Sequence, residues 1–188
     1  MKQNEFRRTI KHYNTPNHAH ELTFSCYHHQ PYLSDEIMCE IFINELTNAR
    51  TQFNFSIWAY VLMQNHVHLL IKPNNEEYSI SKILQYIKGK SSTQYRHYLI
   101  QNFPDKYESM CIIKKARNMF KFWKKGPGFD RNLWSTQAIH NSIQYIEGNP
   151  VRKELCKNPE EYKWSSSFAR ANKIGLIPDT EDIPILMK

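Results

Sequence analysis

The sequence lacks the features that define several classes of protein. Its four cysteines show no Cys-x-x-Cys spacing, so neither a zinc ribbon nor a disulfide framework is predicted, and a reducing compartment fits best. No apolar run reaches membrane-spanning length, and the N-terminus has no apolar signal-peptide core. Internal repeats and low-complexity segments are also absent from the sequence. We therefore expect a cytoplasmic protein without membrane association.

The charge balance is basic, with 25 Lys and Arg residues against 18 Asp and Glu, a net charge of +7 and a pI near 9.2. Such a balance favours a polyanionic partner, nucleic acid first, although a moderate excess of base can also serve solubility alone. The chain is rich in aromatics, and the segment 121–125 interleaves them with lysines. That pattern suits stacking on unpaired bases with phosphate contacts alongside. For this segment alone, an edge strand with an apolar inner face is the simpler interpretation.

The order of the predicted elements indicates the fold class. Alternation and β-forming residues predict four strands, at 21–27, 53–63, 66–72 and 119–124. Capping residues and helical spacing predict three helices, at 34–50, 79–100 and 135–149. This order is that of a ferredoxin-like α+β sandwich with a central antiparallel four-stranded sheet, plus a C-terminal helix. We predict one domain over 1–168, an irregular insertion at 101–116 and a coil-rich C-terminal tail over 169–188.

The most informative stretch is an apolar, strand-like run that contains His66 and His68. Successive side chains of a strand point to opposite faces, so these imidazoles project together while Val67 and Leu69 project on the other face. Burial of two imidazoles costs free energy unless their nitrogens have partners, and one shared metal ion would satisfy both. The pair is therefore set to hold one cation.

The last predicted helix carries Tyr145 and Asn149, four residues apart and so one turn above the other on one flank. If the sheet presents the two histidines with a metal ion, Asn149 can supply a third, oxygen ligand and Tyr145 lies within reach of a substrate. A phenol attacks poorly unless its target is made more electrophilic, as by a cation that polarises a phosphoryl oxygen. The products would be a 5′-phosphotyrosine and a free 3′-hydroxyl, which suits strand transfer.

Two motifs resemble those of a known family. The run 60–71 closely resembles the His-hydrophobic-His motif of HUH single-tyrosine transposases, and 145–151 resembles the tyrosine helix of their REP-associated branch. The motifs come in the family's order. Three further segments look like features of that branch: 122–123, 129–132 and 162–167.

The resemblance implies a HUH endonuclease fold that cuts and rejoins single-stranded DNA near hairpins, using Mg²⁺ or Mn²⁺. It implies His66 and His68 as metal ligands and Tyr145 as the nucleophile, while Asn149 as third ligand follows from the Tyr-x-x-x-Asn spacing. Many relatives have proline where this chain has Gln64, a departure that bears on DNA specificity more than on chemistry. In this family the tyrosine and the histidines meet within one chain or across a homodimer, and the sequence leaves both open.

Each of these signals has a simpler interpretation when taken alone. A His-x-His pair is often incidental, and His18 and His20 form a second one in a polar segment with no identified downstream partner. Two other functions also stay open. One is a metal-dependent phosphodiesterase in which His66 and His68 activate water, and the other is a DNA-binding module of this fold that lacks catalysis.

Basic residues outside the two motifs are candidate contacts to DNA phosphates, with solvated surface charge as the alternative. For Arg131, an ion pair with Asp130 within a loop is a further alternative. The candidates are Arg7, Arg8, Lys11, Lys88, Lys90, Lys124, Lys125 and Arg131.

Overall fold

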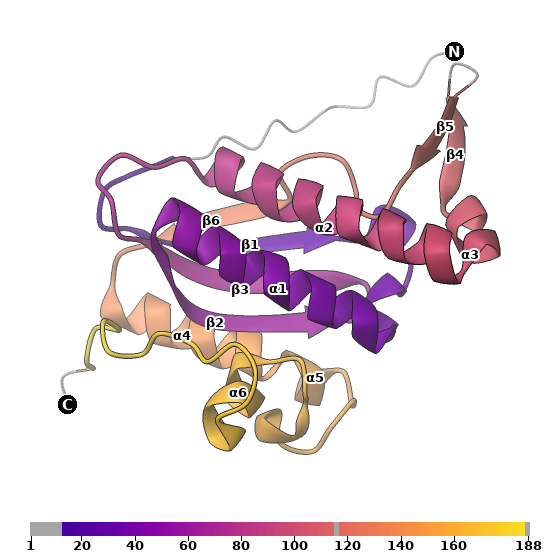
Figure 1. The fold of residues 1–188 in the computed structure, drawn as a ribbon. Helices are drawn as coiled ribbons and strands as arrows, with labels where there is room; N and C mark the ends of the chain where they lie inside the picture. Colours follow the sequence, from indigo (N-terminus) through magenta and orange to yellow (C-terminus); the bar gives the residue numbers. More distant parts are fainter. Residues whose placement is uncertain (1–12, 115–116, 187–188) are drawn as a thin grey trace, which may run out of the picture.

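The centre of the molecule is a four-stranded antiparallel sheet, shown in Figure 1. The computed structural model describes residues 13–114 and 117–186. The sheet has the strand order β2-β3-β1-β6. Its strands are β1 (Ala19–Ser25), β2 (Phe55–Met63), β3 (His66–Pro73) and β6 (Phe129–Leu133). With helices between β1 and β2 and after β3, this is the ferredoxin-like arrangement, and the predicted fold class is confirmed.

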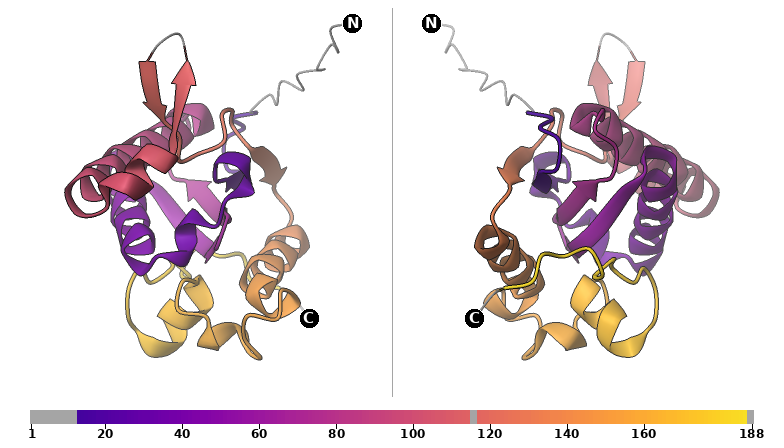
Figure 2. Two further views of the ribbon diagram at one scale, coloured as in Figure 1. Left: turned by 90° about the vertical axis from the view of Figure 1, so that its right-hand side faces the viewer. Right: turned by 90° about the vertical axis from the view of Figure 1, so that its left-hand side faces the viewer.

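Helices cover both faces of the sheet, as the two side views in Figure 2 show. On one face lie α1 (Glu36–Phe53) and α2 (Ile80–Asn102), which pack against each other, and on the other lies α4 (Thr136–Glu147). Each of the three begins at a side chain that accepts a hydrogen bond from a backbone N–H of the first turn. These capping residues are Asp35, Ser79 and Ser135.

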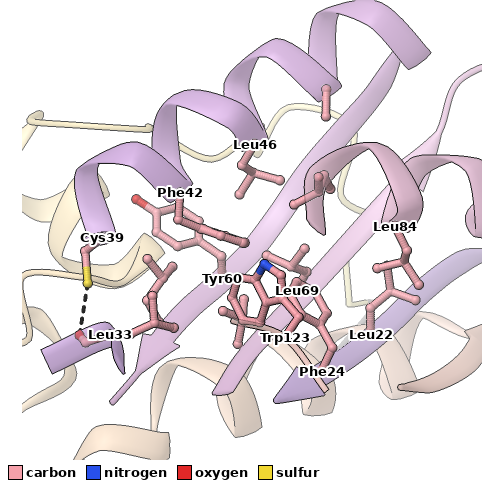
Figure 3. Packing of buried hydrophobic residues seen from close by; sticks show 14 of the residues in the cluster. Leu22, Phe24, Leu33, Cys39, Phe42, Leu46, Tyr60, Leu69, Leu84 and Trp123 are labelled. Atoms are coloured by element: carbon pink, nitrogen blue, oxygen red, sulfur yellow. Dashed lines mark hydrogen bonds between the residues drawn. The ribbon is translucent and has the colours of Figure 1, made fainter. Parts of the chain in front are cut away.

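The larger hydrophobic core lies between the sheet and the α1–α2 layer (Figure 3). Strand β3 contributes Val67, Leu69 and Ile71 to it, whereas Leu70 belongs to a smaller cluster under α4. The alternation of β3 therefore divides it between two cores, and the face toward α4 is the one that bears the histidines. Each buried aliphatic side chain contributes about 1.5–3 kcal/mol, so the larger cluster dominates the stability of the fold.

The fourth strand of the sheet is not the predicted one. Residues 119–124 do not form it: Arg117–Phe120 is β5, which pairs with β4 (Cys111–Lys114) in a separate hairpin that projects from the sheet in Figure 2. The segment 121–125 has no continuous strand, and Phe122 and Trp123 are buried in the larger core rather than free to stack on bases. The prediction was wrong because β6 is a polar edge strand without an apolar alternation.

Two other segments are more regular than predicted. The insertion at 101–116 contains the end of α2, a short α3 (Pro104–Ser109) and β4. After α4 the chain forms α5 (Asn149–Arg152) and α6 (Ser166–Asn172), with short 3-10 turns elsewhere. Helix α6 runs across residue 168, and the division into a domain and a tail at that point stays a prediction. None of the helices in the described part of the chain has the length and apolar character needed to cross a membrane.

Gly128 fixes the approach of the chain to β6. It has a φ of +83°, and a Cβ atom there would lie 2.2 Å from the Thr23 carbonyl oxygen. Only glycine allows so close a contact between this loop and β1.

Candidate active site

His66 and His68 stand at the start of β3 and face α4. They pair across the sheet with Ser25 and Thr23 of β1, the strand that lies between β3 and the edge strand β6. The two rings are nearly perpendicular, and the two Nε2 atoms are 3.1 Å apart. The structure thus brings together the imidazoles that the strand period placed on one face.

The opposite nitrogens of the two rings have their own partners. Asn65 Oδ1 lies 2.6 Å from His66 Nδ1, and Thr23 Oγ1 lies 2.8 Å from His68 Nδ1. An amide oxygen only accepts, so it assigns the His66 proton to Nδ1, and we assign the same tautomer to His68 with the Thr23 hydroxyl as acceptor. Both Nε2 lone pairs then point into one space, which is the arrangement that second-shell partners give to metal-binding histidines.

Burial keeps both imidazoles neutral. It lowers the pKa of His68 to about 4, with the neighbouring His66 and Arg152 adding to the effect. The pKa of His66 is lowered too, first by burial and then by His29 and Lys153. At neutral pH both rings therefore carry the free lone pairs that a cation requires.

Asn149 supplies the third polar group at this point. Its amide Nδ2 lies 3.0 Å from His68 Nε2, and rotation of the amide by half a turn would present Oδ1 instead. Asn149 is buried, and it opens α5 after a bend at Gly148 rather than continuing α4. Within the described ranges no group of three or more His, Cys, Asp or Glu side chains gathers, so the donor set is two imidazoles and one amide.

This donor set fits a divalent cation. Two ligands held at about 2.1 Å in neighbouring octahedral positions lie about 3 Å apart, and the two Nε2 atoms are separated by 3.1 Å. Imidazole nitrogen and amide oxygen are both usual ligands of divalent ions. The residues that could hold the ion are His66, His68 and Asn149.

Tyr145 lies against the histidines from α4. Its ring is edge-to-face with His68, with the ring centroids 5.7 Å apart, and its side chain is 48% exposed. The guanidinium of Arg152 covers the ring, with its carbon 4.4 Å from the ring centroid. A phenol that is open to solvent and stands beside two imidazoles can act on a substrate that binds there. Sequence reasoning missed Arg152, which lies one residue beyond the motif.

Helix α4 is anchored to its own chain on both sides of Tyr145. Ser142 donates a hydrogen bond to Glu21 of β1 at 2.8 Å. The buried Glu147 accepts hydrogen bonds from Ser166 at 2.7 Å and from Arg170 at 2.8 Å, both on α6. These contacts place the phenol and the two histidines in one site formed by a single chain.

Comparison with known protein families identifies the family of this chain. The family model described as transposase, IS200-like, matches residues 14–149, which is most of the chain. The chain belongs to the IS200-like transposase family. The family expected from the two motifs is thereby confirmed, and it is a family of enzymes that cleave DNA and transfer strands. Among the curated proteins compared, none matches the chain.

Solved structures support the fold of this transposase-family chain. It is similar to a REP-associated tyrosine transposase bound to a REP hairpin, at 13% identity and a TM-score of 0.67, over 95% of this chain and 98% of that chain. At that identity the likeness shows the fold, which is the one predicted from the REP-associated motifs. A protein of Deinococcus radiodurans R1 assigned as a transposase matches at 18% identity over 75% of this chain and 97% of that chain. Its TM-score of 0.45 is too low to carry an argument.

Three of the basic residues predicted to contact DNA meet in one cleft of the transposase-family fold. A cavity of about 660 Å³ lies between α2 and the segment 120–127, and its lining includes Lys88, Lys124 and Lys125. The Lys124 N–H donates to the Ser25 carbonyl at 2.9 Å, and Ser25 is paired with His66. The cleft therefore borders β1, the strand next to β3, but on the α2 side of the sheet, whereas the histidines face α4.

Lys88, a candidate contact to DNA phosphates, is engaged with its own chain. Its ammonium donates to the carbonyl oxygens of Lys124, at 2.9 Å, and Gly126, at 2.7 Å, so it holds the loop that forms the far wall of the cleft. Burial lowers its pKa to about 8. Lys90 is exposed outside the cleft, with its ammonium 5.7 Å from the centroid of the Tyr86 ring.

The remaining candidates lie elsewhere. Arg131 is on β6, not in a loop, and it pairs with Glu21 at 2.5 Å while keeping about half of its side chain exposed. Its neighbour Asp130 instead contacts His20 at 2.8 Å. Arg7, Arg8 and Lys11 fall outside the described residues.

Proposed function

We propose that this protein is a single-stranded DNA endonuclease and strand transferase that acts through a 5′-phosphotyrosine intermediate. The observation that carries the proposal is the convergence, in one chain, of the His66 and His68 Nε2 atoms with the Asn149 amide and the Tyr145 ring. This is the combination of a cation-binding set and a protein nucleophile that the chemistry requires.

Each side chain has a definite role in the reaction. The Tyr145 hydroxyl attacks the phosphorus atom of a phosphodiester, a P–O bond to tyrosine forms, and the P–O3′ bond breaks. The phenol proton passes through water to the departing 3′ oxygen. In the reverse direction a 3′-hydroxyl attacks the phosphotyrosine and releases the phenol, so no external energy source is needed for rejoining. The exposure of Tyr145 gives both strand ends access.

Mg²⁺ or Mn²⁺ is the proposed cofactor, held by His66, His68 and Asn149. When bound, the ion would polarise a phosphoryl oxygen and offset the charge that develops on it. The protein side of the site is prepared for this role, because burial keeps the imidazoles neutral and Thr23 and Asn65 orient them.

The proposed substrate is a single strand next to a hairpin. The relative of like fold was solved with a REP hairpin, which supports a hairpin partner and the REP-associated branch for this chain. The basic charge of +7 and the lysine-lined cleft beside β1 supply candidate phosphate contacts for the DNA that flanks the cleaved bond. Lys88, Lys124 and Lys125 are the contacts we favour. Lys90, Arg131, Arg7, Arg8 and Lys11 stay predictions.

We also propose that one chain is sufficient for cleavage. The anchors of α4 on Glu21 and on α6 belong to the same chain as the histidines. Tyr145 then acts in cis, and a homodimer is not required for the chemistry. A cytoplasmic location stays a prediction from the sequence.

The proposal is tested by trapping the covalent product. The full chain is incubated with Mn²⁺ and a pool of synthetic single strands, each with one hairpin and randomised flanks, and protein-linked DNA is separated under denaturing conditions. We expect an adduct with the parent protein and none with Tyr145→Phe, while DNA binding is retained. Tyr98→Phe, on α2 and remote from the site, serves as the matched control and should form the adduct normally.

The alternatives make opposite predictions in the same assay. Cleavage by Tyr145→Phe without an adduct would assign the reaction to activated water, and thus to a phosphodiesterase. Binding without cleavage by the parent, together with no Mn²⁺ bound at His66 and His68, would identify a DNA-binding module that lacks catalysis.

A further inference from the structure

Arg152 is built into the site by two contacts and by the space that Gly148 leaves. Its guanidinium stacks on the Tyr145 ring at 4.4 Å, and one N–H donates to the Tyr145 carbonyl oxygen at the end of α4. A Cβ atom at Gly148 would lie 3.0 Å from a guanidinium nitrogen of Arg152, so the glycine leaves the room in which the group lies. The side chain is long and flexible in isolation, and these contacts give it one orientation.

The charge of Arg152 is not neutralised by a carboxylate of the described chain. Other arginines near α4 are paired with carboxylates, Arg131 with Glu21 and Arg170 with Glu147. No described carboxylate pairs with Arg152, and its side chain is exposed. A guanidinium has five N–H donors, and a single one meets the Tyr145 carbonyl. The remaining donors stay available for an anion beside the phenol.

A phosphodiester is the anion that fits this place. Attack by the phenol leaves negative charge on the nonbridging oxygens of the phosphorus, and a planar guanidinium binds two such oxygens in parallel. A guanidinium side chain keeps its positive charge in proteins, so it can serve through the whole reaction. The geometry puts this charge on the face of the nucleophile's own ring.

We propose that Arg152 binds a nonbridging oxygen of the scissile phosphate and orients the Tyr145 ring for attack. The inference rests on the proposed function. In the attack the new Tyr145–phosphorus bond forms as the P–O3′ bond breaks, and the phenol proton ends on the 3′ oxygen. Arg152 exchanges no proton or electron in this step: it donates hydrogen bonds that strengthen as charge gathers on the phosphoryl oxygen.

The first test compares three variants of Arg152 for the rate of adduct formation at saturating DNA. We expect Arg152→Gln and Arg152→Ala to be slower by on the order of a hundredfold, and Arg152→Lys to recover part of the loss because it restores the charge without the planar stack. Lys157→Gln, an exposed lysine of equal charge outside the site, should form the adduct at the parent rate. Thermal melting checks that every variant is folded.

The second test separates binding of the phosphate from orientation of the ring. Once the cleaved bond is mapped from the adduct, it is replaced by a phosphorothioate as separate Rp and Sp diastereomers. Sulfur accepts hydrogen bonds poorly, so we expect the parent to cleave one diastereomer slowly in both Mg²⁺ and Mn²⁺. In Arg152→Gln that extra slowing should disappear.

The outcomes distinguish this inference from the proposed function. If the parent forms no adduct, or if Tyr145→Phe still forms one, both fail. If the parent forms the adduct and Arg152→Gln forms it at the same rate, the Arg152 inference alone is overturned. A slower Arg152→Gln that keeps the full diastereomer preference also overturns it, because the arginine would then act on the tyrosine only.

Discussion

Two His-x-His pairs, one in β3 and one at the start of β1, lie on opposite faces of the sheet and have different roles. In β3, His66 and His68 share one face and leave their Nε2 lone pairs directed at each other. In the other pair His18 precedes β1 and stacks on Trp134, while His20 is fully buried. The His20 nitrogens are each 2.8 Å from a partner, Asp130 and Tyr78.

The difference shows that spacing alone does not make a site. A pair can share an ion when both side chains lie on one face and one nitrogen of each ring faces the same position. The His20 ring has no such nitrogen, so it holds β6 and Tyr78 together and serves the fold. Asn65 and Thr23 hold the Nδ1 atoms of His66 and His68, and the two Nε2 atoms face each other and the Asn149 amide, which orients both rings toward one shared position.

Substitution of a histidine in each pair should affect different properties of the protein. The largest effect expected is on the rate of adduct formation. His68→Ala removes a proposed cation ligand at the centre of the site, so adduct formation should fall by on the order of a thousandfold. His20→Ala should form the adduct at close to the parent rate when assayed below its melting temperature. Equal loss of activity in the two variants, both shown to be folded, would contradict the division of roles.

The next effect is on the free energy of unfolding, and here the variant of the β1 pair should lose more than the variant of the β3 pair. His20→Ala removes two hydrogen bonds of a fully buried ring and leaves a cavity, so the free energy of unfolding should fall by about 3 kcal/mol. His66→Ala should cost under about 1 kcal/mol, because its ring is partly exposed and contributes little to either core. Urea denaturation in the presence of EDTA measures both. A larger loss for His66→Ala would show that the β3 pair is structural.

The smallest effect concerns the α2 face, where Lys88 is half-buried beside the cleft. Its pKa of about 8 in the folded protein is below the 10.5 of an ordinary lysine. Between these pH values the unfolded chain holds the proton that the folded protein has lost, so stability should rise with pH by on the order of 1 kcal/mol. Lys88→Met should lack this increment when denaturation is compared at pH 8 and above. An equal rise in both proteins would rule out Lys88 as its source.

Much of the site could be predicted because its signals are local. The β-strand period alone places His66 and His68 on one face, and the helix period places Tyr145 and Asn149 on one flank. What the sequence motif did not contain is the break at Gly148, which separates Asn149 from α4, and the stacking of Arg152, seven residues after Tyr145, on the tyrosine ring. Arg152 could have been found from its place two helical turns after Tyr145, but only if the helical path was expected to go on past Gly148.

The errors in the fold have a different cause. Strand β6 is an edge strand whose Phe129 and Arg131 are exposed, so it has no apolar alternation to detect. The aromatic segment around Phe122 and Trp123 has the composition of a strand, yet it crosses the end of β1 as irregular chain and fills the core. Burial there is decided by contacts with α1 and α2 that lie far away in sequence, and composition cannot report them.

The contact of Gly128 with Thr23 has a practical consequence for engineering. Thr23 steers the His68 ring, so a side chain at 128 would push on the strand that sets the direction of a proposed ligand. Pro127 and Gly128, the two residues before β6, should be kept in any redesign, since a substitution there would misdirect the His68 ring while the fold stays intact.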